Sequence, residues 1–276
     1  MKISFIGGGA RVKATYNIFK GRDGFEIGGF FCNPLSDCAD VAIESNSKLY
    51  GCIDDLCNDS DVIVIATADQ ALPSVINTMS KLHTNGKVIL SIADCVHKDE
   101  LDTGYDNTYG VFITSAPFEN LNEKELSNPS VICEISGKRF DEFKKAIDLS
   151  RIKCTFVTKE QLDLYRTTIH LVQDGISALL LAGAKFMKIS AEKDASDLMP
   201  TIRCAMMNTL GSQGAKIPEM YKKGKLPDIM FFVNILENMG IDSVTNIYKA
   251  VATYLTEASC ADKGNVDEVI RRLKRQ

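Results

Sequence analysis

Short apolar segments alternate with helix-sized polar stretches over the first 157 residues of this 276-residue chain. Such alternation is typical of repeated strand–helix units, whose strands assemble into one parallel sheet. The segments 62–66 and 88–90 are apolar throughout, as expected of strands that helices cover on both faces. Helical spacing predicts helices at 70–82 and 138–149. The predicted strands are 2–6, 26–31, 62–66, 87–92, 108–114, 131–135 and 153–157.

The strand pattern ends at residue 157, and a helical pattern takes its place. Apolar residues then recur every three or four positions from Tyr165 to Leu180, which predicts an amphipathic helix. Further helices are expected at 195–210, 228–238, 243–256 and 265–274, separated by segments rich in glycine and proline. The second part of the chain is therefore expected to be all helical.

Three glycines, Gly7, Gly8 and Gly9, lie between the first strand and the helix that follows it. At such a turn, backbone N–H groups approach a pyrophosphate closely, and the helix dipole favours its negative charge. Arg11 is a candidate phosphate ligand. Val12 occupies the third glycine position of the dinucleotide-binding pattern, so a turn without any ligand is the alternative. We predict a dinucleotide site here.

Polar residues at the ends of later strands extend this candidate site. Asn33 follows the second strand, where an NAD site usually carries an acidic residue and an NADP site a basic one, and neither is present. NADP is slightly favoured as the cofactor, and NAD stays open. Ligands of open α/β sheets bind at the carboxyl ends of strands, so Thr67, Ala68, Asp69 and Ser91 are further candidates. Asp69 has an alternative role as a helix cap.

The fold class that follows is α/β. An N-terminal Rossmann-like parallel-sheet domain that binds a dinucleotide is expected at 1–157, and an all-helical substrate and dimerisation domain at 158–276. Two apolar segments, 176–184 and 229–233, are more apolar than surface helices require, which predicts a homodimer through the helical domain.

Composition excludes several classes of function. A net charge of −4 and an isoelectric point near 5.5 argue against nucleic acid as a partner and favour a small molecule. No segment resembles a signal peptide or has the roughly 20 apolar residues that a membrane span needs, so we expect a cytoplasmic protein. The nine cysteines contain no CxxC motif and are interpreted as reduced core thiols, and with three histidines no zinc site is expected.

Several segments resemble those of the DUF2520 family of two-domain Rossmann proteins. That family is related to ketopantoate reductase, pyrroline-5-carboxylate reductase and F420-dependent NADP oxidoreductase. The similar segments are 3–9 with Arg11 and Val12, 65–69, 115–118, and Leu164 with Tyr165. The resemblance spans nearly the whole chain and implies an oxidoreductase with a Rossmann-like domain and a helical domain.

The chain departs from that family at three positions. Ala116 and Arg166 stand where the family often has histidine, and Asp174 stands where it has asparagine. These departures leave the family's proton chemistry open in this chain.

A polar stripe nevertheless runs along the helix after residue 157, because Arg166, His170, Gln173 and Ser177 share one face. We interpret His170 as a candidate proton donor and Arg166 as a candidate carboxylate clamp, with Asp174 beside them as the third candidate catalytic residue. The alternative is a structural ion pair between His170 and Asp174.

The function predicted from the sequence is an NAD(P)-dependent oxidoreductase acting on a small, anionic carbonyl or imine. A non-catalytic dinucleotide sensor is the main alternative, and a scaffold with an empty cleft is a weaker one. The missing family histidines favour the sensor, whereas the stripe with Arg166 and His170 favours the enzyme.

Overall fold

The computed structural model describes residues 1–93, 95–114, 129–191, 200, 221, 226–258 and 263–274. The chain divides into two compact units, Met1–His170 and Leu171–Gln276. The domain boundary expected near residue 157 stays a prediction.

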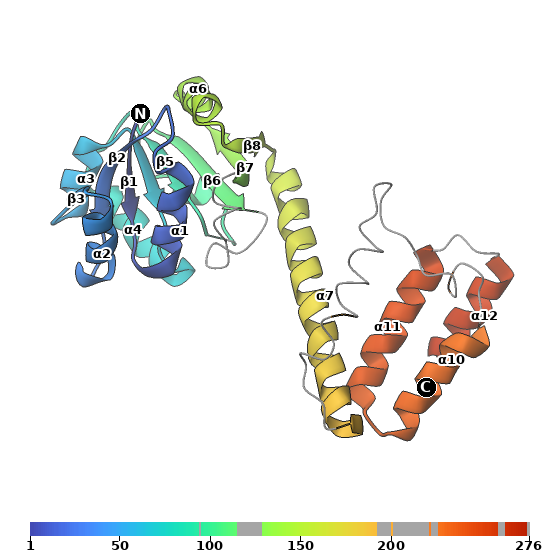
Figure 1. Cartoon of the computed structure of the whole chain (residues 1–276). Helices are drawn as coiled ribbons and strands as arrows, with labels where there is room; N and C mark the ends of the chain where they lie inside the picture. Colours follow the sequence, from blue (N-terminus) through green and yellow to red (C-terminus); the bar gives the residue numbers. More distant parts are fainter. Residues whose placement is uncertain are drawn as a thin grey trace. The chain divides into compact units, whose positions relative to one another are not determined.

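The first unit contains one eight-stranded sheet with the order β3-β2-β1-β4-β5-β6-β7-β8 (Figure 1). Strands β1 to β6 are parallel, β7 pairs antiparallel with β6, and β8 runs parallel to β7. A mostly parallel α/β unit followed by helices confirms the predicted fold class. The strands are β1 Lys2–Ile6, β2 Glu26–Phe31, β3 Lys48–Leu49, β4 Val62–Ile65, β5 Val88–Ser91, β6 Thr108–Thr114, β7 Ser130–Ser136 and β8 Lys153–Phe156.

Helices cover both faces of this sheet. Alternate residues of the central strands enter two separate apolar clusters, so Val64 packs on one face and Ile63 and Ile65 on the other. The first cluster includes side chains of α1 (Gly9–Phe19), α2 (Ser36–Glu44) and α6 (Phe140–Ser150). The second includes side chains of α3 (Ile53–Asp59), α4 (Leu72–Met79), the short helix η2 (Lys98–Leu101) and the start of α7 (Lys159–Ala191). Strands apolar at every position are the sequence signature of such a two-sided core.

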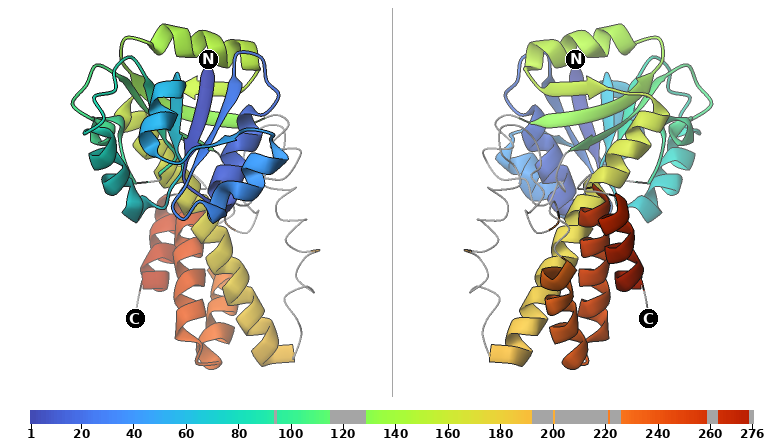
Figure 2. Two further views of the ribbon diagram at one scale, coloured as in Figure 1. Left: turned by 90° about the vertical axis from the view of Figure 1, so that its left-hand side faces the viewer. Right: turned by 90° about the vertical axis from the view of Figure 1, so that its right-hand side faces the viewer.

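In the described residues, the helical unit contains the later part of α7 and the helices α10 (Leu226–Asn238), α11 (Asp242–Ala258) and α12 (Lys263–Lys274). Figure 2 shows these three side by side, and α11 contacts both of the others. Their core includes Ile229, Val233 and Ala252. Three of the expected helices are thus confirmed, and the one expected at 195–210 lies almost entirely outside the described residues. No helix in the described part of the chain is long and apolar enough to cross a membrane.

The cysteines that the structure describes include one disulfide, so the expectation that all of them are reduced thiols is wrong. Cys32 follows β2 and Cys38 lies in the first turn of α2, and they are bonded to each other. The sheet and α2 bring their Cα atoms to 6.1 Å, a separation that a disulfide spans. The six-residue spacing lacks the CxxC form, so no motif in the sequence indicates the pair. Cys52, Cys57, Cys95, Cys133 and Cys154 are free, whereas Cys204 and Cys260 lie outside the described residues.

Candidate functional site

The chain turns sharply between β1 and α1, at the three predicted glycines. The Gly7 N–H donates a hydrogen bond to the Phe31 carbonyl of β2 at 2.8 Å. Gly7 has φ +134°, and a Cβ there would lie 2.5 Å from the backbone oxygen of Ala66, so only glycine fits. Gly9 has φ +71°, with open space where its side chain would be. This turn therefore places the backbone of α1 directly against the carboxyl ends of β1 and β4.

The N-terminus of α1 is built without an acidic or capping side chain. Gly8 is the N-cap residue, it makes no side-chain cap, and the first turn of α1 contains no Asp or Glu. The first N–H groups of a helix have no partners within the helix, and the helix dipole adds partial positive charge there. This arrangement favours an anionic group such as a phosphate.

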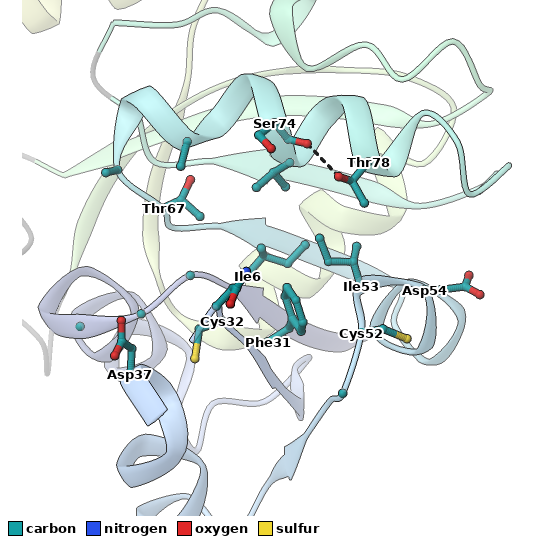
Figure 3. A pocket seen from close by; sticks show the side chains of 18 of the residues that line it. Ile6, Phe31, Cys32, Asp37, Cys52, Ile53, Asp54, Thr67, Ser74 and Thr78 are labelled. Carbon is teal, nitrogen blue, oxygen red and sulfur yellow. Dashed lines mark hydrogen bonds between the residues drawn. The ribbon is translucent and has the colours of Figure 1, made fainter. Parts of the chain in front are cut away.

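A cavity of about 960 Å³ opens beside this turn. Its size lies at the upper end of the range for small-molecule and cofactor sites. Figure 3 shows Thr67, Ser74 and Thr78 on one side of it, and Phe31, Cys32 and Asp37 on the other. Six of the predicted cofactor residues line it: Gly7, Gly8, Gly9, Asn33, Thr67 and Ala68.

The other three predicted cofactor residues, Arg11, Asp69 and Ser91, do not line this cavity. Arg11 donates a hydrogen bond from Nη1 to Asp69 Oδ1 at 3.0 Å, which joins the first turn of α1 to the segment after β4. Asp69 begins the short helix η1 (Asp69–Ala71), whose N-cap is Ala68 and has no side-chain cap, so the cap hypothesis for Asp69 is wrong. Ser91 is fully buried and its hydroxyl accepts from the Ala93 N–H at 3.1 Å.

Thr67 contributes an unusual polar group to the cavity wall. Its Oγ1 atom is buried and has no hydrogen-bond partner among the described residues. Leaving a buried hydroxyl without a partner costs about 1–3 kcal/mol, so nearly all such groups in folded proteins are satisfied. A ligand with a polar group at this position would satisfy it.

Sequence reasoning missed the cavity wall that follows β3. Tyr50 donates to Asp59 Oδ2 at 2.7 Å, and Lys2 donates to Asp59 Oδ1 at 2.7 Å. The bonds from Lys2 and Tyr50 lower the pKa of Asp59 to about 2, and burial followed by the Asp59 contact raises the pKa of Tyr50 to about 12. Because the carboxylate pKa is depressed, this stabilising link weakens only as pH falls from about 4 towards 2. It fixes the chain just before Gly51–Asp54, which lines the cavity.

No sequence pattern indicates that wall, because β3 has only two residues and no apolar periodicity. On the opposite wall, the cavity-lining Ser74, Val75 and Thr78 belong to a helix whose periodicity was recognised, although nothing in the periodicity marks a face that meets a ligand.

The candidate catalytic residues lie on α7. Arg166 is 8% exposed, and its Nη2 donates to the backbone oxygens of Val96 at 2.6 Å and Ala93 at 3.3 Å. His170 and Asp174 are exposed, and no ion pair joins them in the described part of the chain. The catalytic roles of these three residues stay predictions.

The histidine with close acidic neighbours is His97, which sequence reasoning did not select. Its Nδ1 lies 3.1 Å from Glu134 Oε2 on β7, and its Nε2 lies 3.2 Å from Asp163 Oδ1 on α7. Glu134 is buried. Together with Arg166, this cluster attaches the start of α7 to the sheet. Residues so far apart in the chain offer no motif, so only the fold reveals them.

The family-like segment 115–118, including Ala116, lies outside the described residues. Within the described ranges, no group of three or more His, Cys, Asp or Glu residues is arranged to hold a metal ion.

Neither protein-family models nor curated protein sequences match this chain. The DUF2520 assignment therefore stays a prediction. Solved structures do match over most of the chain. One of them is a Bacteroides fragilis protein whose name gives an inferred activity as an NADP oxidoreductase. It is 13% identical to this chain, the match covers 93% of this chain and 98% of that chain, and the TM-score is 0.70.

Two further similar structures carry the names of reductases. An imine reductase from Aspergillus terreus is 12% identical, with 99% and 92% of the two chains covered and a TM-score of 0.60. A 1-pyrroline-5-carboxylate reductase from Streptococcus pyogenes is 17% identical, with 93% and 98% covered and a TM-score of 0.57. At such low identity these similarities establish the two-part fold and leave the chemistry to the residues of this chain.

Proposed function

We propose that this protein binds NADP(H) and is an NAD(P)-dependent oxidoreductase. The observation that carries the proposal is the glycine turn, which directs the uncapped N-terminus of α1 to a cavity of about 960 Å³. The unpartnered Thr67 hydroxyl in the cavity wall supports a bound polar ligand. The Aspergillus terreus imine reductase was solved in complex with NADPH4, and a reductive aminase from the same organism with NADPH.

The residues present fit a dinucleotide that is held mainly by backbone. The backbone amides at the N-terminus of α1 suit the pyrophosphate, and Asn33 offers an amide to the ribose end of the molecule. The cavity lining holds Asp37 and Asp54 and, among the described residues, neither Lys nor Arg. A bound nicotinamide supplies the hydride, while the protein provides binding, orientation and exclusion of water.

For the substrate we propose a small carbonyl or imine. The names of the similar structures, imine reductase, reductive aminase and pyrroline-5-carboxylate reductase, support this class. The anionic character expected from the sequence depended on Arg166 as a carboxylate clamp. Because that guanidinium donates to two backbone carbonyls, we propose the substrate class without a charge.

The same observation favours a second candidate function, a dinucleotide sensor without catalysis. Arg166 is engaged with backbone, and His170 and Asp174 show no mutual ion pair in the described structure. Binding and turnover separate the two candidates. We expect NADPH to raise the melting temperature of the full chain, with NADH and reduced F420 compared at the same concentration. Oxidation of NADPH in the presence of cyclic imines or ketones supports the enzyme, and binding without turnover supports the sensor.

Cys52 provides an independent test of where the dinucleotide binds. Cys52 is exposed and lines the cavity, whereas Cys95 is exposed but lies outside it. We expect saturating NADPH to slow alkylation of Cys52 by iodoacetamide by about tenfold. A ligand in such a cavity has most of its surface against the wall and would therefore cover the Cys52 thiol.

Peptide mass spectrometry reads each thiol separately in this experiment. Cys95 should react at the same rate with and without NADPH. Cys57 should stay unmodified, since burial raises its pKa to about 12 and keeps the thiol protonated. Equal protection of Cys52 and Cys95 contradicts binding in this cavity.

We also propose that the chain forms a homodimer through its helical unit. Ile229 and Val233 are buried within that unit, whereas Phe231 and Phe232 of the same segment are 60% and 46% exposed. Leu179 and Leu181 on α7 are exposed as well. We expect sedimentation equilibrium to give twice the 30.3 kDa chain mass at micromolar concentration, and Phe231→Ser to shift the protein towards monomer. A wild-type protein that stays monomeric contradicts the proposal.

A further inference from the structure

The Cys32–Cys38 disulfide closes a small ring at the edge of the cavity. Cys32 lies directly after β2 and lines the cavity, and Cys38 lies in the first turn of α2. The five residues between them include Asn33 and Asp37, which both line the cavity. The disulfide therefore fixes the segment that forms one wall of the candidate dinucleotide site.

Asp37, which lies within the ring, is adjacent to the glycine turn. A Cβ placed on Gly8 would lie 2.7 Å from the Cβ of Asp37, so the two residues are in direct contact. Asp37 immediately precedes Cys38, which holds it at this position. Figure 3 shows Asp37 and Cys32 on the same side of the cavity. A carboxylate beside the place where a pyrophosphate would bind repels it by Coulomb interaction.

We propose that the Cys32–Cys38 disulfide is a thiol-exchange site for a dithiol reductant, and that its reduction tightens dinucleotide binding. Opening the ring frees the first turn of α2, so Asp37 withdraws from Gly8 and its repulsion of the phosphates falls. The inference rests on the proposed function, since it takes the ligand of the cavity to be a dinucleotide.

The exchange chemistry balances with the dithiol as the reductant. One thiolate of the dithiol attacks a sulfur of the pair, forms a mixed disulfide and releases the other cysteine as a thiolate, which takes up a proton. The second thiol of the reductant then displaces the remaining protein sulfur. Two electrons and two protons pass to the cysteine pair, and the reductant leaves as a disulfide. Cys32 is 3% exposed and lines the cavity, whereas Cys38 is completely buried, so the dithiol approaches the pair from the cavity and attacks Cys32.

The other described cysteines, including the exposed Cys52 of the cavity wall, are free thiols, so a reductant finds no disulfide to open at any of them. Cys133 on β7 and Cys154 on β8 are close enough to hydrogen-bond, yet both are free thiols. The contact with Cys154, followed by burial, raises the pKa of Cys133, which keeps that thiol protonated and unreactive. Among the described residues, the bond that a dithiol can open is therefore the Cys32–Cys38 disulfide.

The test compares the full chain in oxidised and reduced form, with the Cys32–Cys38 bond verified by non-reducing peptide mapping. Without ligand, we expect dithiothreitol to accelerate hydrogen–deuterium exchange in peptides that cover 7–11 and 33–38. With NADPH, we expect the Kd measured by nucleotide fluorescence to fall about tenfold on reduction, as relief of one close like-charge contact implies. Cys38→Ser should bind like the reduced protein and ignore dithiothreitol.

Two matched variants identify the charge that acts. Asp37→Asn should tighten NADPH binding in the oxidised protein and reduce the ratio between the two redox states towards one. Asp54→Asn changes a carboxylate of the same cavity outside the ring and should leave that ratio unchanged.

The outcomes distinguish this inference from the proposed function. Equal NADPH affinity in both redox states, or exchange at 7–11 and 33–38 that ignores reduction, overturns the role of the disulfide and leaves dinucleotide binding intact. Absence of NADPH, NADH and reduced F420 binding in both states overturns the proposed function. If hydrogen–deuterium exchange at 7–11 and 33–38 still changes on reduction in that case, the disulfide controls the cavity, and the ligand of the cavity is another molecule.

Discussion

Replacing Gly9 with aspartate is expected to abolish NADPH binding while the protein stays folded. Apart from the adjoining backbone, no described residue lies within 4 Å of the position of a Cβ on Gly9, so the new side chain meets no steric conflict with them. Its φ of +71° lies in the left-handed region, which aspartate and asparagine tolerate better than other residues, at a cost of about 1 kcal/mol. A carboxylate at the N-terminus of α1 would repel the pyrophosphate directly, and we expect the Kd to rise by at least about 100-fold.

Gly9→Asn is the matched control, because it has the same shape and backbone requirement without the charge. We expect this variant to lose less than about tenfold in affinity and to have the same melting temperature as Gly9→Asp. Fluorescence titration with NADPH measures binding, and thermal unfolding without ligand measures folding. Equal losses in the two variants would indicate a steric cause, and full affinity in Gly9→Asp would place the phosphates elsewhere.

Arg166→Met is expected to lower the free energy of unfolding by about 3 kcal/mol. Methionine retains much of the length of the arginine side chain but donates no hydrogen bonds, so the backbone oxygens of Ala93 and Val96 lose their partner in a buried place. The cluster of His97, Glu134 and Asp163 loses the neighbouring positive charge as well. Arg166→Lys keeps the charge and should recover part of the loss.

Urea unfolding followed by far-ultraviolet circular dichroism measures this effect. Phe5→Ala, a substitution in the core between the sheet and α1, identifies the transition of the first unit, and the effect of Arg166→Met should fall in the same transition. If Arg166 is instead a substrate clamp, the methionine variant keeps its stability and loses turnover, with KM affected before NADPH affinity. That result would restore the interpretation of Arg166 as a catalytic residue.

The sheet was predictable because its strands carry a strong signal. Segments that are apolar at every position, such as Val62–Ile65, suit only a strand covered on both faces, and β1, β2 and β6 were predicted with the bounds they have. The apolar pattern of a strand is the same in either direction, so it carries no information about strand direction. The alternation of strands and helices predicted a parallel sheet, whereas β7 and β8 run against the other strands.

The candidate site was predictable only where local backbone geometry sets the function. Glycines at a strand–helix turn indicate close approach of a ligand, and all three line the cavity. Arg166 shows the opposite case, since helical periodicity placed it on a polar stripe but carried no information about the backbone carbonyls that it meets. The contact of Asp37 with Gly8 depends on how α2 packs, so no sequence motif predicts it.

The unbroken helix α7 also has a consequence for how this chain can evolve. Its 33 residues belong partly to each of the two compact units. Inserting or deleting one residue within it turns every later side chain by about 100° around the helix axis and moves it about 1.5 Å along that axis. All apolar residues of α7 that follow the insertion or deletion would then point away from the side chains they now pack against. Substitutions can therefore accumulate in α7 over long divergence, whereas we expect insertions and deletions to be confined to the connecting loops.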